Sequence, residues 1–171
     1  VYAGSTFCAA VQNNDMVAAY ANDNWSQPNL QPAREDLDLS LQNVTVDTFV
    51  QNLQENITTD SLDFDIQVLK GDSSGLSKKD FKHDVNIIFY DGDNSEHKMR
   101  EFFLNMLDFT EDVFTLVIDD ANIEENVAIT KRFIDAMGLK ILYERELLND
   151  QEDAEMWWNG LYVVVLSKSK L

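Results

Sequence analysis

The chain has 171 residues, of which 44% are hydrophobic, and its 31 acidic and 13 basic side chains give a formal net charge of −18. This length suits one packed domain, so we expect a single domain over residues 1–171. The charge repels phosphate backbones and anionic membranes, and no apolar stretch reaches the roughly 20 residues of a membrane span, so we expect neither nucleic acid nor membrane partners. A lone cysteine, Cys8, excludes a disulfide framework within the chain and favours a cytoplasmic protein.

The first half of the chain alternates predicted helices and strands. Apolar spacing predicts helices at Phe7–Val11 and Val46–Ile57 and strands at Met16–Ala21 and Phe64–Leu69. Thr45 stands where it would cap the second helix. Residues 27–43 hold both prolines, and we interpret them as a surface excursion with one short helix at residues 34–41.

A strand, helix and strand are predicted for residues 85–120. The apolar runs Val85–Tyr90 and Val113–Ile118 lack polar alternation, which is typical of parallel strands covered on both faces. Between them, residues 95–108 carry apolar side chains at the spacing of a helix with one buried face. A right-handed crossover makes the strands parallel, so both end at the edge where open α/β sheets bind ligands. Carboxylates follow both strands, and we expect the active site there.

The last third of the chain is predicted to hold one helix and two strands. Ile123–Met137 has helical spacing, and Gly138 follows it as a stop signal. Leu139–Tyr143 and Leu161–Leu166 have strand character, and we expect them to pair antiparallel at one edge of the sheet.

Four polar motifs stand at predicted strand ends: Gly4-Ser5-Thr6, Asp23-Asn24-Trp25-Ser26, Asp91-Gly92-Asp93 and Asp119-Asp120. In this order they resemble the class I S-adenosylmethionine-dependent methyltransferases, in particular the compact small-molecule branch, and the resemblance spans the whole chain. It implies an α/β fold, a Rossmann-like three-layer sandwich with a mostly parallel sheet and an antiparallel last strand. It also implies methyl transfer from S-adenosylmethionine to a hydroxyl of a small-molecule acceptor.

The resemblance further implies where the cofactor binds. Gly4 and Ser5 look like the end of the loop that holds the methionine part. Asp23 would accept hydrogen bonds from the ribose hydroxyls, and these donors suit a carboxylate. Asp72 and Ser73 would face the adenine. The predicted cofactor contacts are Gly4, Ser5, Asp23, Asp72, Ser73 and Asp91.

A metal site is also predicted at the acidic edge. Asp91, Asp119 and Asp120 would converge as an oxygen-only cluster, which suits Mg²⁺ or another hard divalent cation. Such a cation would lower the pKa of an acceptor hydroxyl, and Asp93 is the predicted general base. The alternative is that these acids simply end strands at a solvent edge. We interpret His97, one helical turn further on, as a surface residue.

A second function stays open, namely a non-catalytic protein of the same fold that binds a nucleoside or a partner. Val1-Tyr2-Ala3 leads at once into the first motif, so we expect an N-terminally truncated chain that lacks a central first strand. Such a gap would leave strand edges unpaired, and another segment or a second subunit of a homo-oligomer is expected to fill it. The acceptor pocket is expected from residues 27–45 and 145–159, including Trp157 and Trp158.

Overall fold

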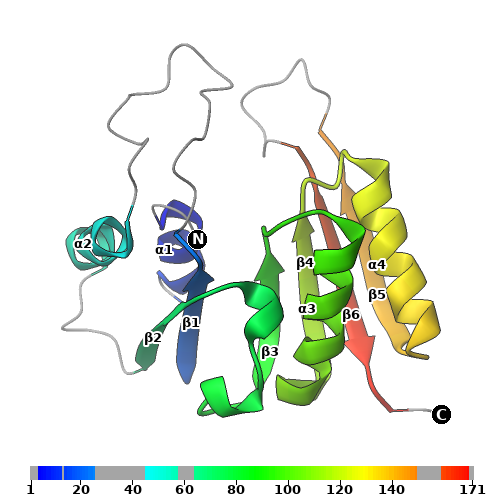
Figure 1. Cartoon of the computed structure of the whole chain (residues 1–171), viewed down its shortest axis with the longest axis horizontal. Coiled ribbons are helices and arrows are strands. Elements are labelled where there is room, and N and C mark those ends of the chain that lie inside the picture. The colour runs from blue at the N-terminus through cyan, green and yellow to red at the C-terminus, as the bar shows by residue number, and fades with distance from the viewer. Residues whose placement is uncertain (1–3, 13, 26–44, 58–63, 150–158, 170–171) are drawn as a thin grey trace. The chain divides into compact units, whose positions relative to one another are not determined.

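The computed structural model describes residues 4–12, 14–25, 45–57, 64–149 and 159–169 (Figure 1). The chain divides into two compact units, Val1–Ser73 and Ser74–Leu171. The described strands form a two-stranded sheet and a four-stranded sheet. The expectation of one domain for the whole chain stays a prediction, as does the upstream first strand.

The described part of the first unit contains two helices and a parallel pair of strands. They are α1 (Ser5–Val11), β1 (Ala18–Asp23), α2 (Val46–Asn56) and β2 (Asp65–Lys70). The ladder runs from Ala18 opposite Asp65 to Asp23 opposite Lys70. Strand β1 therefore lies two residues later than predicted, because its pairing with β2 extends through the polar residues Asn22 and Asp23.

The core of the first unit is built around Phe49 of α2, which is fully buried. It packs with other apolar residues of both helices and of β1, namely Phe7, Val11, Ala19, Ala21 and Ile57. The predicted cap of α2 is confirmed, since the Thr45 side chain accepts a hydrogen bond from the Thr48 N–H. Capping fixes where this helix begins. The predicted helix at residues 34–41 and the surface excursion lie outside the described residues.

Within its described residues, the second unit contains a four-stranded sheet with two long helices. Its elements are β3 (Val85–Tyr90), α3 (Glu96–Phe109), β4 (Thr110–Asp119), α4 (Glu124–Ala136), β5 (Lys140–Leu147) and β6 (Leu161–Ser167), and short 3₁₀ turns lie at Ser73–Gly75 and Lys78–Asp80. The strand order is β3-β4-β6-β5. Strands β3 and β4 are parallel, whereas β6 is antiparallel to both β4 and β5. The predicted parallel pair and antiparallel last strand are both confirmed.

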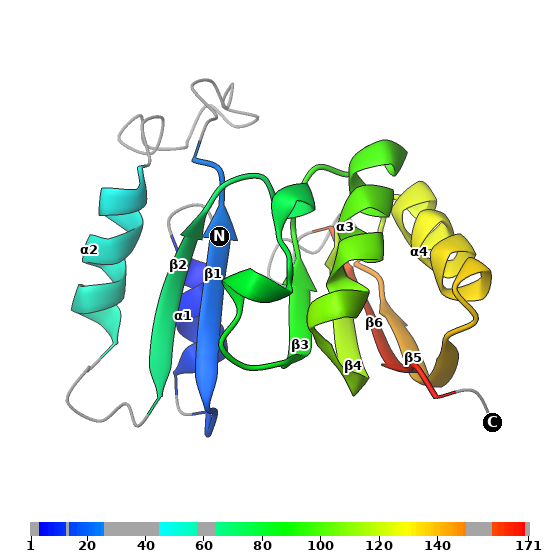
Figure 2. The ribbon, with the colours of Figure 1, turned by 60° about the horizontal axis from the view of Figure 1, so that its bottom comes forward.

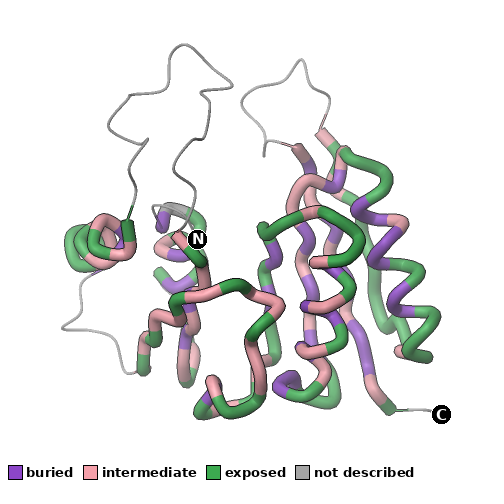
Figure 3. Tube along the Cα trace, viewed as in Figure 1, coloured by how far each residue is buried: buried purple, intermediate pink, exposed green. Residues whose placement is uncertain are grey.

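Helices α3 and α4 lie side by side on one face of this sheet, as Figures 1 and 2 both show. Aromatic side chains make the contact: Tyr90 of β3 packs against Phe102 and Phe103 of α3, and Phe103 packs against Phe133 of α4. Strand β5 is exposed along nearly its whole length (Figure 3). Gly138 adopts the left-handed conformation after α4, with φ 62°, as the stop signal predicts.

Strand β4 begins at Thr110, three residues before the predicted start. The junction with α3 is held by Lys168, whose ammonium donates to the carbonyl oxygens of Leu107 and Thr110, each at 2.6 Å. These carbonyls lie at the end of α3, where a cation is favoured. None of the described helices is long and apolar enough to cross a membrane.

Candidate functional site

In the first unit, the carboxyl ends of β1 and β2 bring Asp23 and Asp72 to one edge of the small sheet. The Gly71 N–H donates to the Asp23 carbonyl at 2.9 Å and so continues the ladder beyond the strands. The Asn22 amide donates to the carbonyl oxygens of Leu69 and Gly71, at 2.9 and 3.1 Å. These bonds fix the chain that leads to Asp72, which is exposed, and to Ser73.

Gly4, at the start of α1, lies against the same part of the core as the end of β1. Its φ is 98°, and a Cβ added to it would stand 2.7 Å from Cδ2 of Phe49. Trp25 also packs against Phe49, with its ring centroid 5.8 Å from that of Phe49. The backbone N–H of Trp25 donates to Oδ1 of Asp23 at 2.8 Å. The start of α1 and Trp25 therefore both lie against one buried ring, and the half-buried Asp23 is joined to Trp25 by a hydrogen bond.

In the second unit, Tyr90 sits beneath the turn that carries Asp91 and Asp93. The Tyr90 hydroxyl donates to the Asp93 carbonyl at 2.8 Å. A Cβ on Gly92 would lie 3.0 Å from the Tyr90 ring, so glycine lets the turn close over that ring. Oδ1 of Asp93 accepts the Ser95 N–H at 2.8 Å, next to the start of α3. Asp93 thus has a local structural role, and its role as general base stays a prediction.

Asp120 accepts hydrogen bonds from three asparagine side chains. Its backbone is left-handed, with φ 56°. Its Oδ2 accepts the side-chain amide of Asn94 at 2.9 Å, and its Oδ1 accepts that of Asn159 at 2.8 Å. Its carbonyl accepts the Asn126 amide at 3.2 Å, so the turn after β4 is also anchored to α4.

Asp119 has a perturbed pKa. Partial burial raises the pKa of its carboxyl to about 6, and the nearby charges of Asp91 and Asp120 push the pKa in the same direction. The Asp120 N–H, which donates to Oδ1 of Asp119 at 2.8 Å, opposes the rise. A half-buried carboxyl whose pKa is moved toward neutrality is typical of functional sites, although structural networks produce the same signature.

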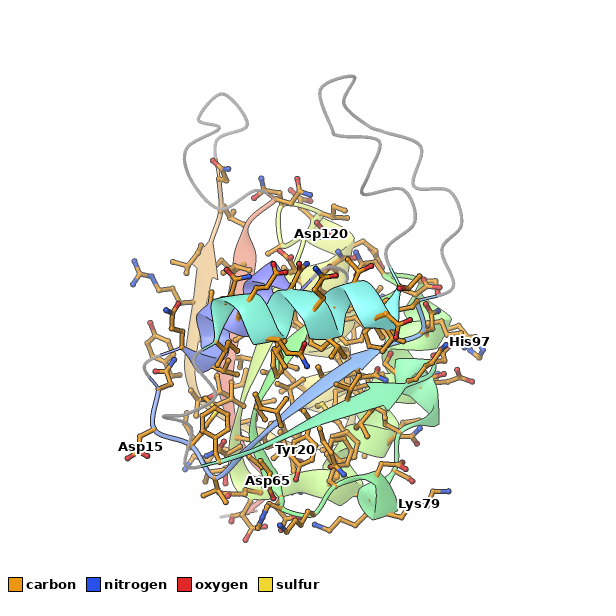
Figure 4. All side chains as sticks on the ribbon, turned by 90° about the vertical axis from the view of Figure 1, so that its left-hand side faces the viewer. Asp15, Tyr20, Asp65, Lys79, His97 and Asp120 are labelled. Atoms are coloured by element: carbon orange, nitrogen blue, oxygen red, sulfur yellow. The ribbon has the colours of Figure 1, made fainter. Side chains whose placement is uncertain are left out.

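The second unit thus brings together Asp91, Asp119 and Asp120 closely enough for their charges to interact. Within the described residues, however, no three His, Cys, Asp or Glu side chains are arranged to hold a metal ion. Carboxylate oxygens are suitable ligands for a hard cation, but these side chains are not arranged to bind one. His97 is exposed and points away from its helix (Figure 4). Its Nε2 lies 3.3 Å from Oε1 of Glu101, one turn further along α3.

Asn94 and Asn159 contact the site and were not predicted from the sequence. Asn94 directly follows Asp91-Gly92-Asp93, and Asn159 precedes Gly160 at the start of β6, so their positions beside turns were the only available signals. Trp157 and Trp158 lie outside the described residues.

No protein-family model matches the chain, and no curated protein matches it. Solved structures do match. An uncharacterized protein from Listeria monocytogenes serotype 4b aligns over 100% of this chain with a TM-score of 0.55 and 16% identity. The O-methyltransferase NovP aligns over 99% with a TM-score of 0.60 and 12% identity. The chain spans 60% of the Listeria protein and 69% of NovP.

The N-methyltransferase NodS from Bradyrhizobium japonicum WM9, in complex with S-adenosyl-L-homocysteine, aligns over 96% of this chain and 72% of its own. Its TM-score is 0.53 and its identity 11%. The chain has the Rossmann-like α/β fold of these methyltransferases. One fold serves several chemistries, so the activity must be argued from the site.

Proposed function

We propose that the chain is an S-adenosylmethionine-dependent methyltransferase acting on a hydroxyl of a small-molecule acceptor. The observation that carries the proposal is that Gly4 and Trp25 both lie against Phe49 and that Trp25 is hydrogen-bonded to Asp23, on a fold shared with NovP and NodS. Gly4 and Ser5 would hold the methionine part of the cofactor, and Asp23 would accept the ribose hydroxyls. Asp72 and Ser73 would face the adenine, and Asp91 is a further proposed cofactor contact.

The proposed reaction is an in-line transfer. The acceptor oxygen attacks the methyl carbon, the bond from that carbon to sulfur breaks, and S-adenosylhomocysteine leaves. The hydroxyl proton passes to a carboxylate, for which Asp93 is the proposed base. Holding the two reactants in line is the main contribution that the binding residues make. The predicted cation at Asp91, Asp119 and Asp120 is not part of this reaction, because the described side chains do not form a ligand group.

The proposed acceptor is a small molecule. NovP is an O-methyltransferase and NodS an N-methyltransferase, so the fold itself does not choose between oxygen and nitrogen. The net charge of −18 disfavours polyanionic acceptors such as nucleic acids and favours a small neutral or cationic one. We also propose that the protein is cytoplasmic and that it forms a homo-oligomer.

The test is the affinity for S-adenosylhomocysteine, measured by isothermal titration calorimetry on the wild type and on Asp23→Ala. Losing one charged hydrogen bond costs about 1.5–3 kcal/mol, so the variant should bind roughly ten- to a hundredfold more weakly. Asp15→Ala is the matched control, because Asp15 is an exposed acid that lies just before β1 in the same unit. Equal affinities for the wild type and Asp23→Ala would contradict the assignment. Binding without transfer to any acceptor would instead favour the nucleoside-binding alternative.

A further inference from the structure

Two asparagines from distant parts of the second unit converge on one carboxylate. Asn94 lies in the turn after β3, and Asn159 lies in the turn before β6, 65 residues later (159 − 94). Each donates its amide to a different oxygen of Asp120, at 2.9 Å for Oδ2 and 2.8 Å for Oδ1. We call this arrangement the amide clamp.

The backbone around the clamp is held as firmly as the side chains. The Ala121 N–H donates to the Gly160 carbonyl at 3.2 Å, and the Asn122 N–H donates to the Asn159 carbonyl at 2.7 Å. A Cβ on Gly160 would stand 2.4 Å from Oδ1 of Asn122, so the two turns are in close contact. The Asn159 amide is thus presented to Asp120 by backbone bonds that do not depend on its own side chain.

We propose that Asn94 and Asn159 are positioning residues, whose amides hold Asp120 as a hydrogen-bond acceptor and keep a divalent cation from taking the same carboxylate oxygens. This inference rests on the proposed function for the role of this edge. It adds that the edge is a hydrogen-bonding site that does not hold a cation.

The physical basis is competition for the same oxygens. An ionised carboxylate offers about four lone-pair positions on two oxygens, and the clamp engages both oxygens. The amide hydrogens carry partial positive charge and point at those oxygens, so a cation placed there would meet them. A hard cation that bound both oxygens at once, in bidentate fashion, would compete directly with these charge-assisted hydrogen bonds.

The experiment measures Mn²⁺ binding, by the electron paramagnetic resonance signal of free Mn²⁺, to the wild type, Asn94→Ala, Asn159→Gly and the double variant. Glycine suits position 159, because the backbone there has φ 66°. The matched control is Asn105→Ala, which removes an amide bond of the same kind, to the Ser74 carbonyl at 2.6 Å, away from Asp120. Circular dichroism confirms folding, and Asn94→Ala alone serves if the double variant does not fold.

The wild type should bind Mn²⁺ with a Kd above about 1 mM, and loss of the clamp should lower this Kd at least about tenfold. Asn105→Ala should leave the Kd unchanged. A gain in affinity is not what mere destabilisation would produce. Tight Mn²⁺ binding by the wild type that weakens in either variant would overturn the proposal, and so would equally weak binding by all variants. Titration with S-adenosylhomocysteine on the same samples tests the proposed function separately, because none of the proposed cofactor contacts belongs to the clamp.

Discussion

Replacing Asp119 by asparagine should stabilise the protein at neutral pH. The folded-state pKa of about 6 lies above the ordinary value of 3.8, so the fold favours the protonated carboxyl. Asparagine has the same shape, stays neutral, and keeps an oxygen that can accept the Asp120 N–H.

The magnitude follows from the pKa difference. A rise of about 2 pKa units corresponds to roughly 3 kcal/mol at most. Because the Asp119 side chain is only half-buried, solvent screening reduces this penalty to about 1 kcal/mol. For a chain of this size such a gain raises the Tm by about 2–4 °C.

The sign of the pH dependence follows from proton binding. Below about pH 4 both states hold the proton, and the wild type carries no penalty. Between about pH 4 and pH 6 the folded state keeps a proton that the unfolded state has lost, so stability falls as the pH rises. Above about pH 6 the penalty is constant. The advantage of Asp119→Asn should therefore be larger at pH 7.5 than at pH 5.

Urea unfolding at pH 5 and pH 7.5, with EDTA present, measures this difference. Glu111→Gln is the control, because it removes one exposed charge from the same strand and so corrects for the general repulsion within an acidic chain. If Asp119→Asn is no more stable than Glu111→Gln at pH 7.5, the reasoning about Asp119 is refuted. A stabilising variant would also indicate that the carboxylate serves something other than the fold.

Two further predictions concern structural support. Gly4→Ala should destabilise the first unit by about 1–3 kcal/mol, because its φ of 98° and the 2.7 Å approach to Phe49 leave no room for a Cβ; urea titration followed by circular dichroism measures the loss, and an unchanged midpoint would count against the described packing. Lys168→Met should cost about 1–3 kcal/mol, because two carbonyl acceptors at the end of α3 lose their donor; faster amide exchange at Phe109 and Thr110 would accompany it, and unchanged exchange there would show that the cap does not hold this junction.

The strands and helices of the second unit were predictable because each carries its own periodic signal. The apolar run at Val85–Tyr90 and the one-sided apolar pattern of α3 depend on neighbours in sequence, which a single chain displays directly. The antiparallel pairing of β5 and β6 followed from their succession along the chain. The shift of β1 by two residues was not predictable, since Asn22 and Asp23 look like a turn until their pairing with β2 is known.

The site was predictable only in part. Acids at strand ends follow from sequence, so Asp91, Asp119 and Asp120 were found, and the structure does bring their charges together. Asp120 has a left-handed backbone conformation in the turn after β4, and this conformation helps to direct its side chain. No local sequence pattern predicts that conformation for this aspartate. The amide clamp joins positions 94, 120 and 159, and contacts over such separations leave no trace in the periodicity of one sequence.

The most direct test of the account is calorimetric titration of the unmodified chain with S-adenosylmethionine in the presence of EDTA, with ATP titrated in parallel. The account predicts saturable binding of S-adenosylmethionine at one site per chain and no comparable binding of ATP, because the proposed contacts recognise the methionine and adenosine parts without a metal. Absence of saturable S-adenosylmethionine binding by the folded chain, or equal binding of ATP, would contradict the proposed function.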